Sequence, residues 1–479
     1  MRTTLFCISD LHLGGAPGEG DAPGFQMCPA AGQRQLAAFI RWAGAQSQDG
    51  QRVHLIIAGD IVDFLAEKEF QPFTASDTAS EAKLREIIKR TQEVFDALAG
   101  FVKDGGQLTL MLGNHDLELC FPQTRRLLLE RLGPGRVEFL YDNQAFTLGP
   151  VLIEHGNRYD EWNAVPHDQL RHARSHLSRG EPTDFEPLPG SEVVYRIVNE
   201  LKGRYSFVDL LKPEDSGMLP LLALLDGRLW QHARSFVVQG WRAFRIRYDQ
   251  ERQPQNENYI AAAPADDERL IRLADEVATG GSADEVGHVM GEPPFVDKWK
   301  QADEETRQRW LERLLSVFRN WVQTHDLAFA VEHEAEKYLK AVRRSVEAGF
   351  KVVVYGHTHM VKRVDVQVKV NGEEKTGVYL NTGTWADLMR LPEEIFTAPE
   401  EDARAALREF AEAIASNQIS PWRTRLPTFA RIELESNDRN EWWLLSADVH
   451  FFDGEGQIQP VTTAEVTRRL GRQKVGTQT

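Results

Sequence analysis

Four short apolar runs constrain the fold of this chain more than any other feature, because each ends in a cluster of Asp, Asn or His. The runs at Thr3–Ile8, Val53–Ala58, Gln107–Leu112 and Lys351–Tyr355 have the character of strands, and helical patterns lie between the early ones. Strands without polar alternation are typical of a sheet that is covered on both faces. Glu154–Asn157 forms a fifth cluster after another strand. Because open α/β sheets gather ligands beyond the carboxyl ends of their strands, we expect the five clusters to converge.

The clusters contain residue types that bind transition metals. Alone, each has an ordinary alternative, since an Asp after a strand commonly caps a helix and a His there can lie on the surface. Together, at strand ends, they favour a metal site. Asp and Asn oxygens mixed with His nitrogens suit Mn, Fe, Zn or Ni better than Ca or Mg, and the lack of Cys argues against structural zinc. The clusters are Asp10-Leu11-His12, Gly59-Asp60-Ile61-Val62-Asp63, Gly113-Asn114-His115-Asp116, Glu154-His155-Gly156-Asn157 and Gly356-His357-Thr358-His359.

A carboxylate in such a site can bridge two metal ions. Two cations roughly 3.5–4 Å apart hold both oxygens of an in-line displacement at phosphorus. They also lower the pKa of a shared water molecule, which then acts as the nucleophile. A metal site of this kind is therefore suited to a displacement reaction at phosphorus.

The ordered set of clusters resembles the calcineurin-like metallophosphoesterase superfamily, whose five motifs are D-x-H, G-D-x-x-D, G-N-H-D/E, H-G and G-H-x-H. All five are present, within residues 1–160 and 326–390. The resemblance implies an α/β fold, a β-sandwich of two mixed sheets flanked by helices, here with a mostly helical insertion. It also implies two divalent transition-metal ions, for which we expect Mn, with Fe, Zn and Ni as alternatives.

The resemblance further implies which residues bind the metals. One position would be formed by Asp10, His12, Asp60 and His359, and the other by Asp60, Asn114, His155 and His357, so that Asp60 bridges the two. His115 would be the acid that protonates the leaving oxygen, and Asp116 would orient His115 from behind. Asp63 is expected to be a supporting residue.

The fourth motif extends into His155-Gly156-Asn157-Arg158-Tyr159-Asp160. This looks like the H-G-x-x-x-D form of bacterial enzymes, a group that includes the lipid-A-precursor pyrophosphate hydrolases. Asp160 is expected either to support the site or to cap a loop. Arg158 is expected to bind the substrate, because the motif places it near a metal ligand, and a salt bridge to a local acid is the alternative.

A long insertion separates the fourth and fifth motifs. We expect a metallophosphoesterase domain in two parts, 1–160 and 326–479, with residues 161–325 as a helical lid or substrate platform. Two Arg-rich stretches of the insertion, Arg171–Arg179 and Arg228–Arg247, are candidates for phosphate or base binding. For each stretch the alternative is an amphipathic helix with a solvated arginine face.

The composition indicates the cellular compartment of the protein and argues against some classes of partner. The net charge of −16 argues against a protein that coats nucleic acid by bulk electrostatics. Three cysteines cannot form a disulfide framework, which suits a reducing cytosol. No apolar run approaches the roughly 20 residues that span a bilayer, and the amino-terminal residues do not resemble a signal peptide. We therefore expect a cytoplasmic protein without a membrane partner.

Three functions are compatible with these observations. The first is hydrolysis of a phosphate ester or pyrophosphate bond in a nucleotide or another phosphorylated metabolite, which the acidic charge and the insertion favour. The second is a nuclease for DNA or RNA ends, which requires a continuous basic channel leading to the metals. The third is a non-catalytic scaffold, against which the intact ligands and His115 argue. Homo-oligomers are compatible with all three.

Overall fold

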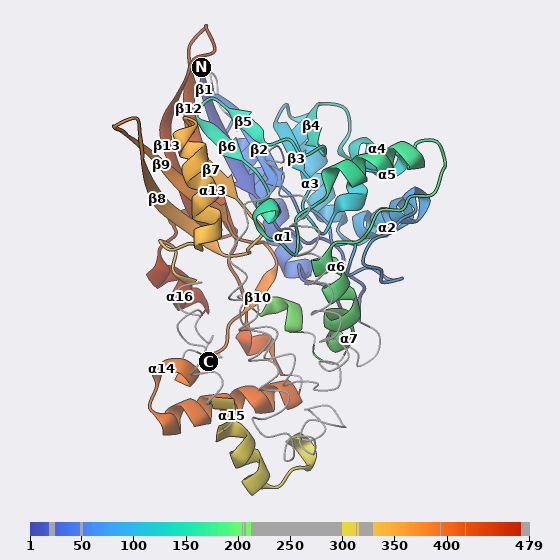
Figure 1. Ribbon diagram of the computed structural model, residues 1–479, viewed down its shortest axis with the longest axis vertical. Helices are drawn as coiled ribbons and strands as arrows, with labels where there is room; N and C mark the ends of the chain where they lie inside the picture. The colour runs from blue at the N-terminus through green and yellow to red at the C-terminus, as the bar shows by residue number, and fades with distance from the viewer. Residues whose placement is uncertain are drawn as a thin grey trace.

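Two mixed β-sheets packed against each other form the centre of the protein in the computed structural model (Figure 1). The structure describes residues 1–18, 24–47, 51–211, 299–315 and 329–470, apart from Arg204, Ser206, Arg313, Glu393 and Asn417. The first sheet has the order β14-β13-β12-β1-β2-β3-β4, with bounds Ile458–Pro460, Trp442–Phe452, Thr428–Ser436, Arg2–Ile8, Gln51–Ala58, Gln107–Met111 and Arg136–Leu140. The second has the order β5-β6-β7-β9-β8, with bounds Phe146–Leu148, Val151–Ile153, Val352–Tyr355, Glu373–Thr382 and Val361–Val370.

Alternate residues of the central strands pack on opposite sides of the first sheet. In β1, Leu5 and Cys7 join the core between the sheets, whereas Phe6 and Ile8 join the core beneath the helices. All four side chains are fully buried. Burial on both faces explains why these strands have no polar alternation, and it confirms the predicted sandwich of two mixed sheets.

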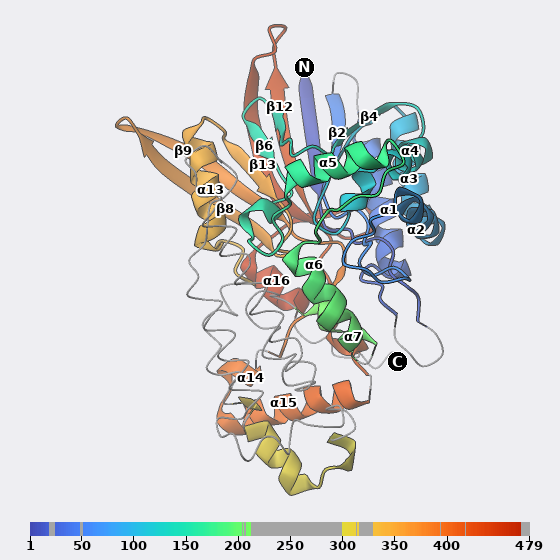
Figure 2. The ribbon, with the colours of Figure 1, turned by 45° about the vertical axis from the view of Figure 1, so that its right-hand side comes forward.

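Helices cover the outer faces of both sheets (Figure 2). The first sheet is covered by α1 (Ala30–Ala45), α2 (Asp77–Arg90), α3 (Gln92–Lys103) and α4 (Pro122–Leu132), and the second by α13 (Glu336–Glu347). The apolar residues at helical spacing between positions 84 and 102 lie in two helices, α2 and α3, and not in one continuous helix. The helix breaks at Thr91, whose hydroxyl donates to the Ile87 carbonyl at 2.8 Å. A β-branched residue with such a bond has little preference for continuing a helix.

The described part of the insertion is helical, as predicted. It contains α5 (His167–Leu177), α6 (Pro189–Val193), a π-helical turn (Val194–Val198) and α7 (Asn199–Lys202). The remaining elements follow the fifth cluster: the β10–β11 ribbon (Asp387–Met389 and Arg423–Arg425), α14 (Glu394–Thr397), α15 (Glu400–Ala415) and α16 (Thr463–Leu470). None of the described helices is long and apolar enough to cross a membrane.

The insertion shares its apolar core with a segment from outside it. Leu201 and Leu311 of the insertion pack in one cluster with Leu407 and Phe410 of α15. In both views α15 lies at the opposite end of the molecule from the amino terminus (Figures 1 and 2). Removal of the insertion would therefore expose the apolar face of α15. The predicted boundaries of the insertion, at residues 161 and 326, stay a prediction.

Glu118 makes stability depend on pH in a predictable direction. It lies in a 3-10 turn (Leu117–Cys120) directly after the third cluster, and its Oε1 accepts the Thr74 N–H at 2.7 Å. Burial raises the pKa of Glu118 to about 7 despite the Thr74 bond and the nearby Lys83. Its contribution to stability is therefore complete below its unfolded pKa of about 4.3 and is lost as the pH rises through about 7.

Glu118→Gln should remove this dependence, because Gln keeps an acceptor for Thr74 and does not ionise. Between pH 4 and pH 8 the free energy of unfolding of the wild type should fall by about 3 kcal/mol relative to the variant. Chemical denaturation of both proteins across this range measures the difference. Parallel pH profiles would show that the Glu118 carboxyl does not titrate differently in the folded state.

Candidate metal centre

Loops at the carboxyl ends of five strands bring the five clusters together. Asp10 follows β1, Asp60 follows β2, Asn114 follows β3, His155 follows β6, and His357 follows β7. The side chains come from both sheets, so the site lies at the edge where the sheets meet. All residues predicted to bind metal are at least nine-tenths buried: Asp10, His12, Asp60, Asn114, His155, His357 and His359.

The backbone at the site is strained. A left-handed conformation costs a residue other than glycine roughly 1–2 kcal/mol, and it occurs in a few per cent of such residues. Among the described residues, five of the predicted ligands adopt it, with φ between 43° and 69°: Asp10, His12, Asp60, His357 and His359. Such strain clusters at functional sites, where the surrounding structure holds it in place.

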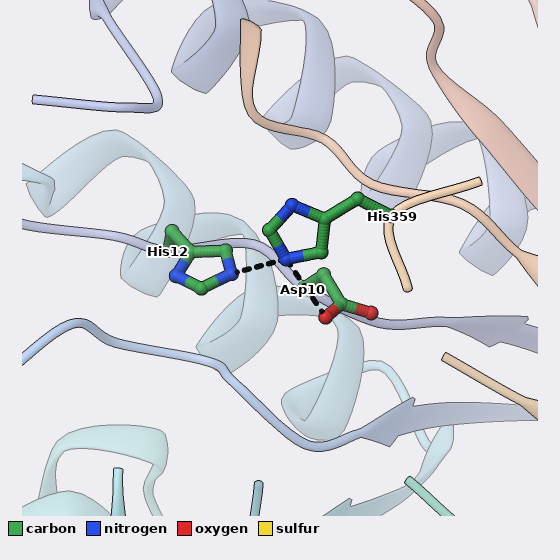
Figure 3. A group of neighbouring side chains, drawn as sticks. All are labelled: Asp10, His12 and His359. Atoms are coloured by element: carbon green, nitrogen blue, oxygen red, sulfur yellow. Dashed lines mark hydrogen bonds and ion pairs between the residues drawn. The ribbon is translucent and has the colours of Figure 1, made fainter. Parts of the chain in front are cut away.

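Asp10, His12 and His359 form the first group of ligand atoms (Figure 3). The two Nε2 nitrogens of His12 and His359 lie 2.9 Å apart, and Oδ1 of Asp10 lies 3.2 Å from Nε2 of His359. Burial alone would raise the pKa of Asp10, but the contact with His359 outweighs it and lowers the pKa to about 2. An ionised carboxylate and two imidazole nitrogens therefore point at one small volume.

Asp10, Asp60 and His155 form the second group, which Asn114 joins. The Nδ1–H of His155 donates to the Ala58 carbonyl at 2.7 Å, so Nε2 is the nitrogen that faces the site. It lies 3.1 Å from Oδ2 of Asp60 and 3.2 Å from Oδ1 of Asn114. Both of these oxygens are acceptors, so a proton or a metal cation must lie among the three atoms. Burial lowers the pKa of His155, but Asp60 outweighs it and raises the pKa to about 9.

Asp60 lies between the two groups. Its Oδ2 contacts His155 and is 3.9 Å from Nε2 of His12, and its Oδ1 accepts the His115 N–H at 2.8 Å. Gly113 permits this arrangement, because a Cβ there would lie 2.0 Å from Oδ1 of Asp60. The donor set, carboxylate and amide oxygens with imidazole nitrogens, fits divalent transition metals.

His357 reaches the site from the second sheet. Its backbone N–H donates to Oδ2 of Asp10 at 2.9 Å, and its ring centre lies 5.4 Å from that of His155. Its Nε2–H donates to Oδ2 of Asp160 at 2.9 Å. Asp160 also accepts the Trp162 N–H through Oδ1, so it supports the site and closes a turn at once.

The Asp63 carboxylate contacts the His115 ring. Oδ1 of Asp63 lies 3.4 Å from Nδ1 of His115, and Oδ2 lies 3.6 Å from Nδ1 of His12. Asp116 was predicted to orient His115, but its carboxylate accepts the N–H groups of Gly113 and Ile61, both at 2.7 Å. Asp116 follows His115 in sequence, yet it faces the backbone beneath the loop. We therefore propose that Asp63, whose carboxylate faces the ring, orients His115, and the role of Asp116 stays a prediction.

Asp63→Asn should lower kcat, and the loss should not exceed the roughly 10²–10⁴-fold that a positioned acid supplies. Asn keeps an acceptor for the N–H groups of Leu65 and Ala66, which Asp63 holds at 3.1 and 3.2 Å, but it loses the charge that faces His115. Kinetics of single and double variants on an alkyl phosphate measure the coupling. If Asp63 acts through His115, adding Asp63→Asn to His115→Gln should cost little more than His115→Gln alone. Independent, multiplying losses would contradict this role.

Arg158 forms the local salt bridge that was the alternative to substrate binding. Its Nη1 donates to Oε1 of Glu154 at 3.1 Å, and its side chain is 30% exposed. Burial lowers the pKa of Arg158, but Glu154 and neighbouring groups outweigh this and raise it. Binding of substrate by Arg158 stays a prediction.

The arginines of the first Arg-rich stretch, Arg171–Arg179, are engaged in ion pairs. Arg171 and Arg174 both pair with Asp142, and Arg179 pairs with Glu181. The exposed Arg171 and Arg179 match the solvated face that was the alternative for this stretch, whereas Arg174 is largely buried and also donates to the Tyr141 carbonyl. The second Arg-rich stretch, Arg228–Arg247, lies outside the described residues.

Asn163 also reaches the site, although it was not predicted to be a site residue. Its Oδ1 accepts from Nδ2 of Asn114 at 3.4 Å, and its Nδ2 donates to Asp160 at 2.8 Å. The only sequence signal is its position three residues after Asp160, within the turn that extends the fourth motif.

Comparison with known protein families agrees with this geometry. The calcineurin-like phosphoesterase family matches residues 3–361, well over half of the chain. The matched range runs from β1 to the first residue of β8 and includes all five clusters. No curated protein matched the chain.

Proposed function

The chain belongs to the calcineurin-like phosphoesterase family and is a metallophosphoesterase, and from this premise we propose a dinuclear enzyme for phosphorylated small molecules. It would hydrolyse a phosphate ester or pyrophosphate bond of a nucleotide or another phosphorylated metabolite. We propose Mn as the metal, with Fe, Zn and Ni as alternatives. The observation that carries the proposal is the place of Asp60, whose carboxylate contacts ligands of both groups.

The described residues suit two adjacent cations. Asp10, His12, Asp60 and His359 would hold the first, and Asp60, Asn114, His155 and His357 the second. When bound, such a pair stabilises the charge of an in-line displacement at phosphorus and lowers the pKa of a water molecule.

His115 has a different role, which its exposure supports. Its side chain is 21% exposed, whereas those of His12, His155, His357 and His359 are at most 8% exposed. A histidine that is shielded from solvent is suited to bind a metal, whereas a partly exposed histidine is accessible to a substrate. We propose that the His115 imidazolium donates its proton to the departing oxygen while Asp63 holds its ring.

Charge favours a small substrate over nucleic acid. The net charge is −16, and the described arginines of α5 are paired with acids. A continuous basic path to the metals is therefore not evident among the described residues, and we keep the nuclease as the alternative. We also propose that the protein is cytoplasmic, because Cys7, Cys28 and Cys120 are free and buried.

A substrate panel tests the proposal. The Mn-loaded protein should be compared on p-nitrophenyl phosphate, bis-p-nitrophenyl phosphate, nucleotides, dinucleoside polyphosphates and single-stranded DNA. We expect the highest kcat/KM on a nucleotide or another small phosphorylated compound. Faster digestion of single-stranded DNA would support the nuclease instead, and no hydrolysis with any of the four metals would favour the scaffold.

A further inference from the structure

The turn that follows the fourth motif contacts ligands from two other motifs. Asp160 contacts His357 of the fifth motif, and Asn163 contacts Asn114 of the third. Asp160 and Asn163 also contact each other, and the Asn163 N–H donates to the Asp160 carbonyl at 3.1 Å. One short turn therefore connects two ligands that are distant in sequence.

The Asp160 carboxylate selects the ring nitrogen with which His357 can bind a metal. Its Oδ2 accepts the Nε2–H of His357 at 2.9 Å. Because Nε2 is occupied by this bond, Nδ1 is the nitrogen with a lone pair. A carboxylate behind a ligating histidine fixes both the tautomer and the orientation of the ring.

The same carboxylate orients Asn114 through Asn163. Since Oδ2 of Asp160 only accepts, Asn163 must turn its Nδ2 toward it, and this bond is 2.8 Å long. The Oδ1 of Asn163 is then directed to Nδ2 of Asn114. Asn114 consequently presents Oδ1, the only end of its amide that binds a metal, to the side where His155 lies at 3.2 Å.

The start of helix α6, further along the insertion, packs directly against this turn. The Gly190 N–H, at the start of α6, donates to the Trp162 carbonyl at 2.9 Å. A Cβ on Gly190 would lie 2.3 Å from Oδ1 of Asn163, so only glycine fits there without displacing that oxygen. Asn163 is also held by Asn157, whose Nδ2 donates to its carbonyl at 2.8 Å.

We propose that Asp160 and Asn163 are positioning residues that orient His357 and Asn114 together and so set the affinity of the second metal position. The inference rests on the proposed dinuclear centre. It assigns the extended fourth motif to the metal site, and it gives the insertion a contact through which it supports that site. Neither residue needs to touch the metal or the substrate.

Calorimetric titration of metal-free protein with Mn tests the proposal. Asp160→Asn keeps the shape of the side chain but loses the charge that faces His357. Its one acceptor oxygen can replace either Oδ2, which accepts from His357 and Asn163, or Oδ1, which accepts the Trp162 N–H, but not both. Its second Mn should bind roughly 10–100-fold more weakly, the usual effect of losing an outer-shell partner, and its first Mn should bind as in the wild type. Asn163→Ala should weaken the second Mn less, because the bond from His357 to Asp160 remains.

In the double variant the two losses of affinity for the second Mn should not multiply, because Asp160 acts partly through Asn163. At a fixed Mn concentration, the electron paramagnetic resonance signal of coupled Mn pairs should be strongest in the wild type, weaker in Asn163→Ala and weakest in Asp160→Asn. Asp168→Asn is a matched control, since Asp168 is an exposed acid paired with Arg171, and it should bind both ions normally.

Second-site affinities equal to that of the wild type in both variants would overturn the proposal. Equal weakening of both positions would also overturn it, because that result indicates a general disturbance of the site. If Asp160→Asn does not fold, as judged by circular dichroism, Asn163→Ala decides the question. Fewer than two ions on the wild type would instead contradict the proposed dinuclear function.

Discussion

Asp60→Ala is expected to lose both metal ions and to reduce hydrolysis by at least about 10⁴-fold. The Asp60 carboxylate contacts ligands proposed for both positions, His12 at 3.9 Å and His155 at 3.1 Å, and Asp10 is the other carboxylate that lies near both. Its loss removes one carboxylate ligand from each metal position and also removes the bridge between the two positions. Since two cations supply several kcal/mol of charge stabilisation at phosphorus, a loss of about 5 kcal/mol or more follows.

Asp60→Asn is the companion variant, because alanine is strained at this position. The φ of Asp60 is 51°, a conformation that Asn tolerates better than Ala does. Asn also keeps an acceptor for the His115 N–H. Metal analysis after dialysis should find neither variant close to two ions per chain, and Asp168→Asn should retain both. Full occupancy in Asp60→Ala would show that Asp60 does not bridge.

His115→Gln is expected to keep the fold and both metals yet lose turnover by roughly 10²–10⁴-fold on an alkyl phosphate, about 3–5 kcal/mol. His115 contacts Asp63 and stacks edge-on against His12 at 4.8 Å between ring centres. These three residues form a third group of neighbouring potential ligand atoms, so the metal content of this variant must be measured with its turnover. Gln retains part of the hydrogen bonding and cannot donate an imidazolium proton. Steady-state kinetics with metal analysis on the same sample separate the two effects.

The leaving group provides the control for this variant. An aryl phosphate departs as a stabilised phenolate and needs little protonation, so the loss should be smaller with p-nitrophenyl phosphate than with the alkyl ester. Near wild-type turnover on the alkyl ester would exclude the acid role. Loss of a metal ion from His115→Gln would make His115 a ligand.

Much of the fold could be predicted from the sequence, because the pattern of apolar residues that determines strands and helices is local. The apolar runs Val53–Ala58 and Lys351–Tyr355 were predicted as strands, and they correspond to β2 and β7. The convergence of the clusters was also predictable, since parallel strands place their carboxyl ends at one edge of a sheet.

Features that depend on contacts between distant residues were not predictable. The orientation of His115 was assigned to Asp116, its neighbour in sequence, but the ring lies against Asp63 from another strand end. The link from Asn163 to Asn114 likewise joins separate loops. Helix α15 has apolar residues at helical spacing, but the second core that it forms with the insertion appears only in three dimensions.

Titration of the metal-free protein with Mn, with bound ions and hydrolysis of p-nitrophenyl phosphate measured on the same samples, tests the central claim most directly. The dinuclear account predicts that binding saturates at two ions per chain and that activity develops only as the second position fills. Full activity in the metal-free protein, or with a single ion bound at saturation, would contradict it.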